Sequence, residues 1–149
     1  MRRLHKSLVM PYSTEKIYTI VADVPAYPQF LPWCGGSRVI QTTESGVEAE
    51  IVIAKGPVRV AFSTLNQQIP FERINMRLTN GPFKQLSGHW TFDSLSEDSC
   101  QVTLALDFEF NNRLLAMTVG AVFEQVIGSL INGFLARAQQ LYGVEKNGN

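Results

Sequence analysis

The chain has 149 residues, the size of one ordinary domain, and it is long enough to bury about two thirds of its unfolded surface without a disulfide or a cofactor. Thirteen basic and thirteen acidic residues cancel, and only 17% of the residues are charged. This balance argues against a nonspecific DNA-binding protein, because such proteins carry a clear basic excess.

The N-terminal segment and the two cysteines predict the cellular compartment of the protein. Residues 1–6 are polar and Pro11 follows soon after, so no signal peptide is visible. No run approaches the ~20 apolar residues that a membrane-spanning helix requires. Cys34 and Cys100 are far apart and lack metal-ligand spacing, as is typical of two ordinary thiols in a reduced compartment. We therefore expect a soluble, cytoplasmic protein.

The first residues predict a strand followed by two short helices. Leu4–Met10 is a β-type segment that stops at a proline. Ser13 can cap a helix that ends before Pro25. Three prolines between residues 25 and 32 then allow at most one more helical turn, in a stiff connector rich in aromatic residues.

From Arg38 onward, apolar and polar residues alternate, and short turn signals separate the segments, which predicts an antiparallel meander. The alternation is clearest near the end, where Leu106 and Phe108 share one face while Asp107 and Glu109 share the other. We expect one dry face and one wet face. The strand candidates are Arg38–Glu44, Val47–Lys55, Val58–Asn66, Glu72–Thr79, Lys84–Asp93 and Cys100–Phe110.

The stretch Asn112–Tyr142 predicts one long helix of roughly 45 Å, because no proline interrupts it. Its apolar residues recur every three or four positions and so share one face: Phe123, Ile127, Leu130, Phe134, Ala138 and Leu141. Gly120, Gly128 and Gly133 each cost about 1 kcal/mol of helix propensity. Two interpretations stay open: the glycines allow close packing, or they leave room beside a cavity.

These elements predict an α+β domain over residues 1–142, followed by a flexible polar tail over residues 143–149. A twisted sheet with one apolar face must cover that face. The C-terminal helix is the only segment long and apolar enough to do so, and we expect the sheet to wrap around it.

No catalytic or metal-binding pattern stands out. His5 and His89 lack clustered cysteines or carboxylates, so a structural role is favoured over metal binding. Asp107 and Glu109 point the same way on a strand, but away from the apolar face, which favours a solvated role. Neither cysteine has an activating neighbour in sequence. We predict no catalytic and no metal site.

Aromatic residues are abundant, and a curved sheet that grips one helix often leaves a void. The rings either line a hydrophobic pocket or fill the core, and the sequence leaves both open. Polar atoms of Asp23, Tyr27 and Arg73 could lie near a cavity mouth. The side chains that we expect to line such a pocket are Phe30, Trp33, Phe62, Met76, Phe83, Trp90, Phe92, Leu106, Phe108, Val119, Phe123, Val126, Ile127, Leu130 and Phe134.

Several motifs occur in order along residues 4–142. They are Pro11-Tyr12-Ser13, Asp23-Val24 with Tyr27-Pro28, Phe30-Leu31-Pro32-Trp33-Cys34, Gly81-Pro82-Phe83-Lys84 with Leu86, Gly88 and Trp90, and Asp107-Phe108-Glu109-Phe110. Together with the order of elements, they resemble the coenzyme Q-binding, START-like branch of the polyketide cyclase/dehydrase superfamily, including its bacterial members of the ribosome association toxin type.

The resemblance implies a helix-grip fold, in which a curved antiparallel sheet wraps around the C-terminal helix and two small helices close one end. It also implies a tunnel for a polyprenyl quinone such as ubiquinone, or a related lipid, and a role in respiration. For the bacterial branch it implies binding to the large ribosomal subunit that blocks subunit joining. It carries no catalytic residues over and requires no cofactor.

Three functions therefore stay open: a non-enzymatic lipid carrier, a ribosome-binding regulator, and, on the superfamily's name alone, a cyclase or dehydrase. The uncharged stretch Leu114–Phe123 could gate a tunnel or touch the inner membrane from the cytoplasm. Ribosome contacts would use basic residues on the outer face: Arg38, Lys55, Arg59, Arg73, Arg77 and Lys84.

Overall fold

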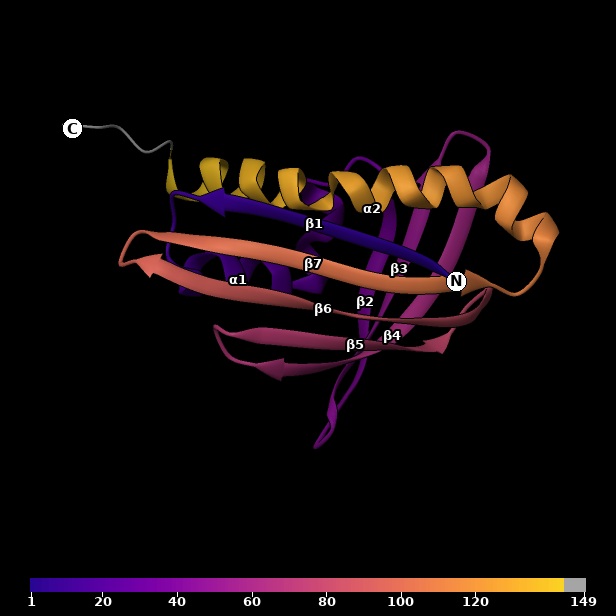
Figure 1. Cartoon of the computed structure of the whole chain (residues 1–149), viewed down its shortest axis with the longest axis horizontal. Coiled ribbons are helices and arrows are strands. Elements are labelled where there is room, and N and C mark those ends of the chain that lie inside the picture. Colours follow the sequence, from indigo (N-terminus) through magenta and orange to yellow (C-terminus); the bar gives the residue numbers. More distant parts are fainter. Residues whose placement is uncertain (144–149) are drawn as a thin grey trace.

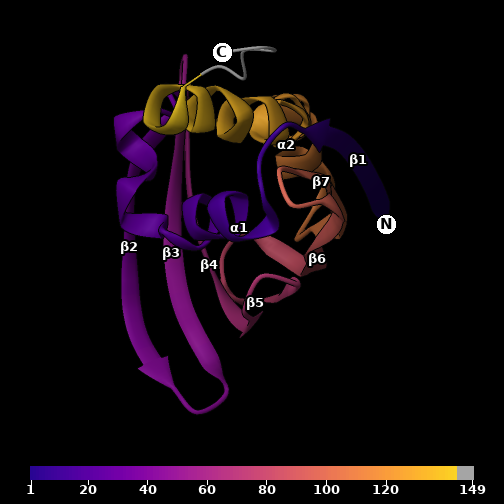
Figure 2. The same cartoon turned by 90° about the vertical axis from the view of Figure 1, so that its left-hand side faces the viewer.

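The computed structural model describes residues 1–143, in which a seven-stranded antiparallel sheet curves around one long helix (Figure 1). The strand order is β1-β7-β6-β5-β4-β3-β2, so β1 and β2 form the two edges. Figure 2 shows the sheet curling beneath α2, with α1 closing one end. The elements are β1 (Arg2–Met10), α1 (Thr14–Ala22), the 3-10 helix η1 (Val24–Gln29), β2 (Cys34–Thr43), β3 (Gly46–Lys55), β4 (Val58–Ile69), β5 (Arg73–Asn80), β6 (Phe83–Ser96), β7 (Ser99–Phe110) and α2 (Arg113–Tyr142). The predicted helix-grip architecture is confirmed. The predicted polar tail, apart from Gly143, lies outside the described residues.

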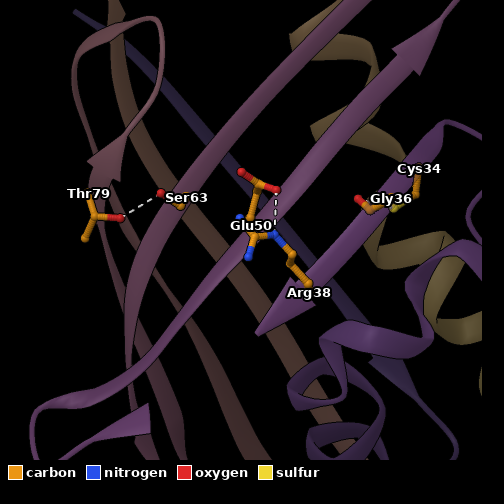
Figure 3. Close-up of polar contacts among 6 residues, drawn as sticks. All are labelled: Cys34, Gly36, Arg38, Glu50, Ser63 and Thr79. Atoms are coloured by element: carbon orange, nitrogen blue, oxygen red, sulfur yellow. Dashed lines mark hydrogen bonds and ion pairs between the residues drawn. The ribbon is translucent and has the colours of Figure 1, made fainter. Parts of the chain in front are cut away.

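The strands agree with the prediction except at some of their ends. The prediction that β2 begins at Arg38 is wrong, because the ladder starts at Cys34, opposite Ile53. The two glycines that follow Cys34 belong to this strand, and its register with β3 shifts between Cys34 and Gly36, as at a bulge. There the Cys34 thiol donates a hydrogen bond to the Gly36 carbonyl oxygen at 3.3 Å (Figure 3).

A second irregularity lies in the middle of the sheet. The register between β4 and β5 shifts between Ser63 and Thr64, whose partners are Asn80 and Leu78. The hydroxyl oxygens of Ser63 and Thr79 lie 2.8 Å apart at this point (Figure 3). Because the buried Ser63 hydroxyl has a partner, the shift leaves no polar atom of that side chain stranded.

The helices begin at the capping residues that the sequence predicts. The Ser13 hydroxyl accepts a hydrogen bond from the Lys16 amide at 3.3 Å at the start of α1. The Asn112 side chain accepts one from the Leu115 amide at 2.9 Å at the start of α2. Each bond satisfies an amide that has no partner within the helix.

One face of α2 lies on the sheet, while its first turns project into solvent, where Leu114 is 69% and Met117 is 74% exposed. The prediction that no segment approaches a membrane-spanning composition is wrong for α2. An 18-residue window of this 30-residue helix has a mean hydropathy of 1.8, so α2 is long and apolar enough to cross a membrane, by length and composition only. Polar residues such as Gln125 and Ser129 interrupt the apolar run within the helix. The helix covers the sheet with this apolar composition.

Candidate functional site: a cavity between the sheet and the long helix

A cavity of about 80 Å³ lies between the concave face of the sheet and α2, with one end near α1 and η1. Space of this size holds several water molecules. Its wall is lined by Val21, Ala22, Val24, Tyr27, Trp33, Val47, Ile51, Ile53, Phe62, Thr64, Asn66, Gln68, Ile74, Met76, Leu86, Trp90, Leu104, Leu106, Phe123, Ile127, Leu130 and Phe134. Within the described residues, none of the lining side chains is charged.

The predicted site residues divide into two groups. Nine of them line the cavity: Trp33, Phe62, Met76, Trp90, Leu106, Phe123, Ile127, Leu130 and Phe134. The other six do not: Phe30, Phe83, Phe92, Phe108, Val119 and Val126. The two interpretations of the aromatic residues therefore each describe part of the molecule.

The four rings among the six contact other rings instead of the cavity, and that of Phe30 packs against Phe134 at 5.8 Å. The ring of Phe83 stacks on that of Phe110, with centroids 4.8 Å apart, and the ring of Phe108 meets that of Phe123 at 4.8 Å. These rings fill the core beneath the first half of α2. Phe92 packs against Tyr18 of α1 at 5.4 Å. Ring packing of this kind stabilises the fold without offering space to a ligand.

The wall also has a polar part that was not predicted from the sequence. Thr64, Asn66 and Gln68 are alternate residues of β4, so they share the inner face with Phe62. The Thr64 hydroxyl donates a hydrogen bond to the Asn66 side-chain oxygen at 2.7 Å. Period-two counting from Phe62 would have placed Thr64 and Asn66 on this face. Gln68 lies beyond the predicted end of that strand.

The three polar residues suggested for the mouth are placed differently by the structure. Tyr27 lines the cavity, but its hydroxyl donates to the Val21 carbonyl oxygen, and burial strongly raises the pKa of the phenol. Asp23 and Arg73 do not line the cavity, and the Arg73 guanidinium instead donates to Asn75 at 2.6 Å. Arg73 occupies an outward-facing position of β5, and Asp23 lies at an exposed position at the end of α1, between the lining residues Ala22 and Val24.

The half-buried lining residues locate the mouth. Val47, Asn66 and Met76 are paired across β3, β4 and β5 and form one row of the sheet. All three are half-buried, as are Gln68 on β4 and Ala22 at the end of α1. Solvent therefore reaches the wall along the row Val47–Asn66–Met76, here called the mouth, and partly at Ile51, Phe62 and Leu130, whereas the other rings of the wall are buried.

The titratable groups lie away from the cavity or are held in unreactive forms. Asp107 pairs with Arg3 at 2.8 Å and Glu109 with Lys84 at 3.8 Å, on the outer face as predicted. Burial raises the pKa of the Cys34 thiol, and it raises that of Cys100 to about 11, with a smaller contribution from Asp93. Within residues 1–143, no cluster of histidine, cysteine or carboxylate side chains has a geometry suited to a metal ion.

Known proteins are similar to this chain over most of its length. The chain is 40% identical over 140 residues to the ribosome association toxin RatA of Pseudomonas aeruginosa, covering 94% of this chain and 97% of that protein. It is 29% identical over 142 residues to the mitochondrial coenzyme Q-binding protein COQ10 homolog B of Xenopus laevis, covering 93% of this chain and 58% of that protein.

Among solved structures, the ZhuI aromatase/cyclase of Streptomyces sp. R1128 superposes with a TM-score of 0.84 at 16% identity, covering 99% of this chain and 98% of that one. At that identity the likeness shows the fold alone. Residues 10–135 match the family described as polyketide cyclase / dehydrase and lipid transport. This match spans most of the sheet, the cavity wall and α2, and the chain belongs to that family.

Proposed function

We propose that the protein is a non-enzymatic binding protein for a hydrophobic molecule, a polyprenyl quinone such as ubiquinone or a related lipid, and that it supports respiration. The observation that carries this proposal is the uncharged, largely apolar cavity between the sheet and α2. The similarity to a protein named for coenzyme Q binding supports it. Charged side chains suited to acid and base chemistry are absent from the described cavity wall, which argues against a cyclase activity.

The size of the cavity sets a condition on binding. About 80 Å³ is well below the ~300–1,000 Å³ of typical small-molecule pockets. A ligand with an isoprenoid chain therefore needs the walls to move apart, and half-buried lining side chains such as Phe62, Met76 and Leu130 are less enclosed than the buried ones. Burial of the chain, at about 0.8 kcal/mol per methylene-sized unit, offsets that rearrangement.

Direct binding measurements test the proposal. Organic extraction of the purified protein followed by mass spectrometry is expected to recover a quinone, and added quinone is expected to raise the melting temperature with the logarithm of its concentration once that concentration exceeds Kd. A folded protein that shows no shift at any soluble quinone concentration would refute the proposal.

The exposed start of α2 suggests where a lipid is collected. We propose that the protein is cytoplasmic and touches the inner membrane through Leu114 and Met117, whose side chains are largely exposed. The double change of Leu114 and Met117 to serine is expected to abolish co-flotation with lipid vesicles while leaving the melting temperature unchanged. Equal flotation of both proteins would rule this contact out.

Ribosome association is the second candidate, favoured by the 40% identity to a protein named as a ribosome association toxin. We propose that it uses the outer face of the sheet, against the large subunit. Arg59 and Arg77 are exposed there, whereas Arg38 is bound to Glu50 at 3.0 Å. Sedimentation of ribosomal particles with added protein tests this candidate. An unchanged subunit profile with no co-sedimentation rules it out.

A further inference from the structure

The polar residues of the cavity wall form one stripe on one strand. Thr64, Asn66 and Gln68 follow each other on the inner face of β4, and each other strand contributes only apolar side chains to the wall. Thr64 is 7% exposed, so it lies inside the wall, while Asn66 and Gln68 are half-buried at the mouth. Polar groups placed in this way in an apolar pocket fix the orientation of a ligand.

The hydrogen bond within the stripe occupies the acceptor end of the Asn66 amide. The Thr64 hydroxyl donates to the Asn66 side-chain oxygen at 2.7 Å, which fixes the amide by its acceptor end. The amide nitrogen of Asn66, a donor of two hydrogen bonds, then points away from Thr64. The Gln68 amide supplies a second donor next to it on the same face. The stripe therefore offers donors to a hydrogen-bond acceptor.

The absence of charge from the described wall restricts the ligand further. A carboxylate or phosphate drawn into this cavity would lose water and gain no cation, which is unfavourable. A neutral head with carbonyl or ether oxygens needs only the amide donors. We propose that Asn66, held by Thr64 as a positioning residue and flanked by Gln68, binds the neutral, acceptor-bearing head of the ligand at the mouth, with its apolar chain lying toward α2. This inference rests on the proposed function and names the chemical class of the ligand: a quinone or similar ketone, not a fatty acid or a phospholipid.

Three probes with the same ten-carbon chain test the inference by titration calorimetry: an alkyl benzoquinone, an alkylbenzene and a fatty acid. The wild-type protein is expected to bind the quinone most tightly and the fatty acid most weakly. Asn66→Leu keeps the approximate size of the side chain but removes both donors. It is expected to weaken quinone binding about 3- to 10-fold, the worth of one or two hydrogen bonds, and to leave alkylbenzene binding within twofold.

Two further variants separate a positioning role from a structural one. Thr64→Val removes the hydrogen bond that holds the Asn66 amide but keeps the amide N–H groups of Asn66 and Gln68. The quinone is therefore expected to bind more weakly, while the alkylbenzene binds as before. Gln67→Leu is the matched control, because Gln67 is adjacent in β4 but exposed on the outer face, where it accepts a hydrogen bond from Asn75 at 3.2 Å. It is expected to change neither affinity.

The outcomes distinguish this inference from the proposed function. If Asn66→Leu lowers the affinities for the quinone and the alkylbenzene equally, or changes neither affinity, the head does not bind the stripe. The inference is then overturned, while hydrophobic binding stands. Fatty acid binding as tight as quinone binding overturns it as well. If the wild-type protein binds none of the probes, the proposed function and the inference fall together.

Discussion

Phe134 joins three parts of the molecule at one ring. Its side chain is 1% exposed, and its centroid lies 5.4 Å from those of Tyr27 and Trp90 and 5.8 Å from that of Phe30. Phe134→Ala is expected to lower the free energy of unfolding by about 3–5 kcal/mol, because it leaves a void where the connector, α2 and β6 meet. Urea unfolding measures this loss. Leu141→Ala, on the same helix but 52% exposed, is the control and should change it by less than about 0.5 kcal/mol.

The buried thiol of Cys100 predicts a dependence of stability on alkaline pH. Burial first, and Asp93 second, raise the pKa of this thiol from 9.0 to about 11. Between these values the unfolded chain has lost a proton that the native protein keeps, so the free energy of unfolding falls as pH rises from about 9 to 11 and is unaffected by this group below 9. Burial raises the pKa values of Cys34 and Tyr27 as well, which adds to the fall.

Replacing the Cys100 thiol tests whether it causes the fall in the free energy of unfolding at alkaline pH. Cys100→Ala is expected to make the free energy of unfolding fall less steeply between pH 9 and 10.5. The total difference is at most about 1.4 kcal/mol for each unit by which the thiol pKa is raised. Urea midpoints at several pH values, in wild type and variant, measure the two slopes. Equal slopes would show that Cys100 does not cause the decline.

The glycines of α2 have different surroundings, which separates the two interpretations made from the sequence. A methyl group on Gly133 would lie 2.7 Å from Leu31 Cδ2, so this glycine allows close packing of the connector. Methyl groups on Gly120 and Gly128 would meet Phe110 and Lys6 only at 3.7 and 3.8 Å, which are ordinary contacts. None of the three lines the cavity. The glycines therefore do not provide its volume.

This difference predicts opposite effects of the same substitution at two positions of one helix. Gly128→Ala gains about 0.5–1 kcal/mol of helix propensity without a clash and is expected to raise the free energy of unfolding by that amount. Gly133→Ala must displace Leu31 and is expected to gain nothing or to destabilise the protein. Thermal and urea unfolding of the pair, each compared with wild type, gives the answer. A stabilising Gly133→Ala would contradict the close-packing interpretation.

The spacing of the apolar residues predicts the elements and the faces that they bury. It does not predict how far along a strand a side chain lies from the cavity. Trp90 and Phe92 share the inner face of β6, yet only Trp90 lines the cavity, while Phe92 lies farther along the strand against Tyr18. Alternation assigns both to one face and cannot separate them, since the separation depends on where α1 and α2 cross the sheet. For the same reason, the polar stripe at Asn66 could be placed on the inner face from sequence, while its position at the mouth could not.

At the scale of the whole molecule, the two proposed functions use different surfaces. Ligand binding uses the cavity beneath α2, and ribosome association uses exposed side chains such as Arg59 and Arg77. Since the backbone of the sheet lies between them, a change confined to the interior should alter one function and not the other. The two functions can then be tested in one set of variants.

A residue that fills the cavity from the helix side performs this test. Leu130 is half-buried on α2 and lines the wall, so the larger ring of Leu130→Trp is expected to occupy the space and lower quinone affinity at least tenfold, at a stability cost of about 1–3 kcal/mol. Gln125→Trp, exposed on the opposite side of α2, is the control and should leave quinone binding intact.

Calorimetry measures quinone binding, and co-sedimentation with ribosomal particles measures binding by the outer face in the same preparations. Because the filled cavity leaves the outer face unchanged, the Leu130→Trp protein should behave as wild type in sedimentation. Retention of quinone affinity in the folded variant would show that the ligand does not enter this cavity, and loss of both bindings together would show that the interior and the outer face act as one unit.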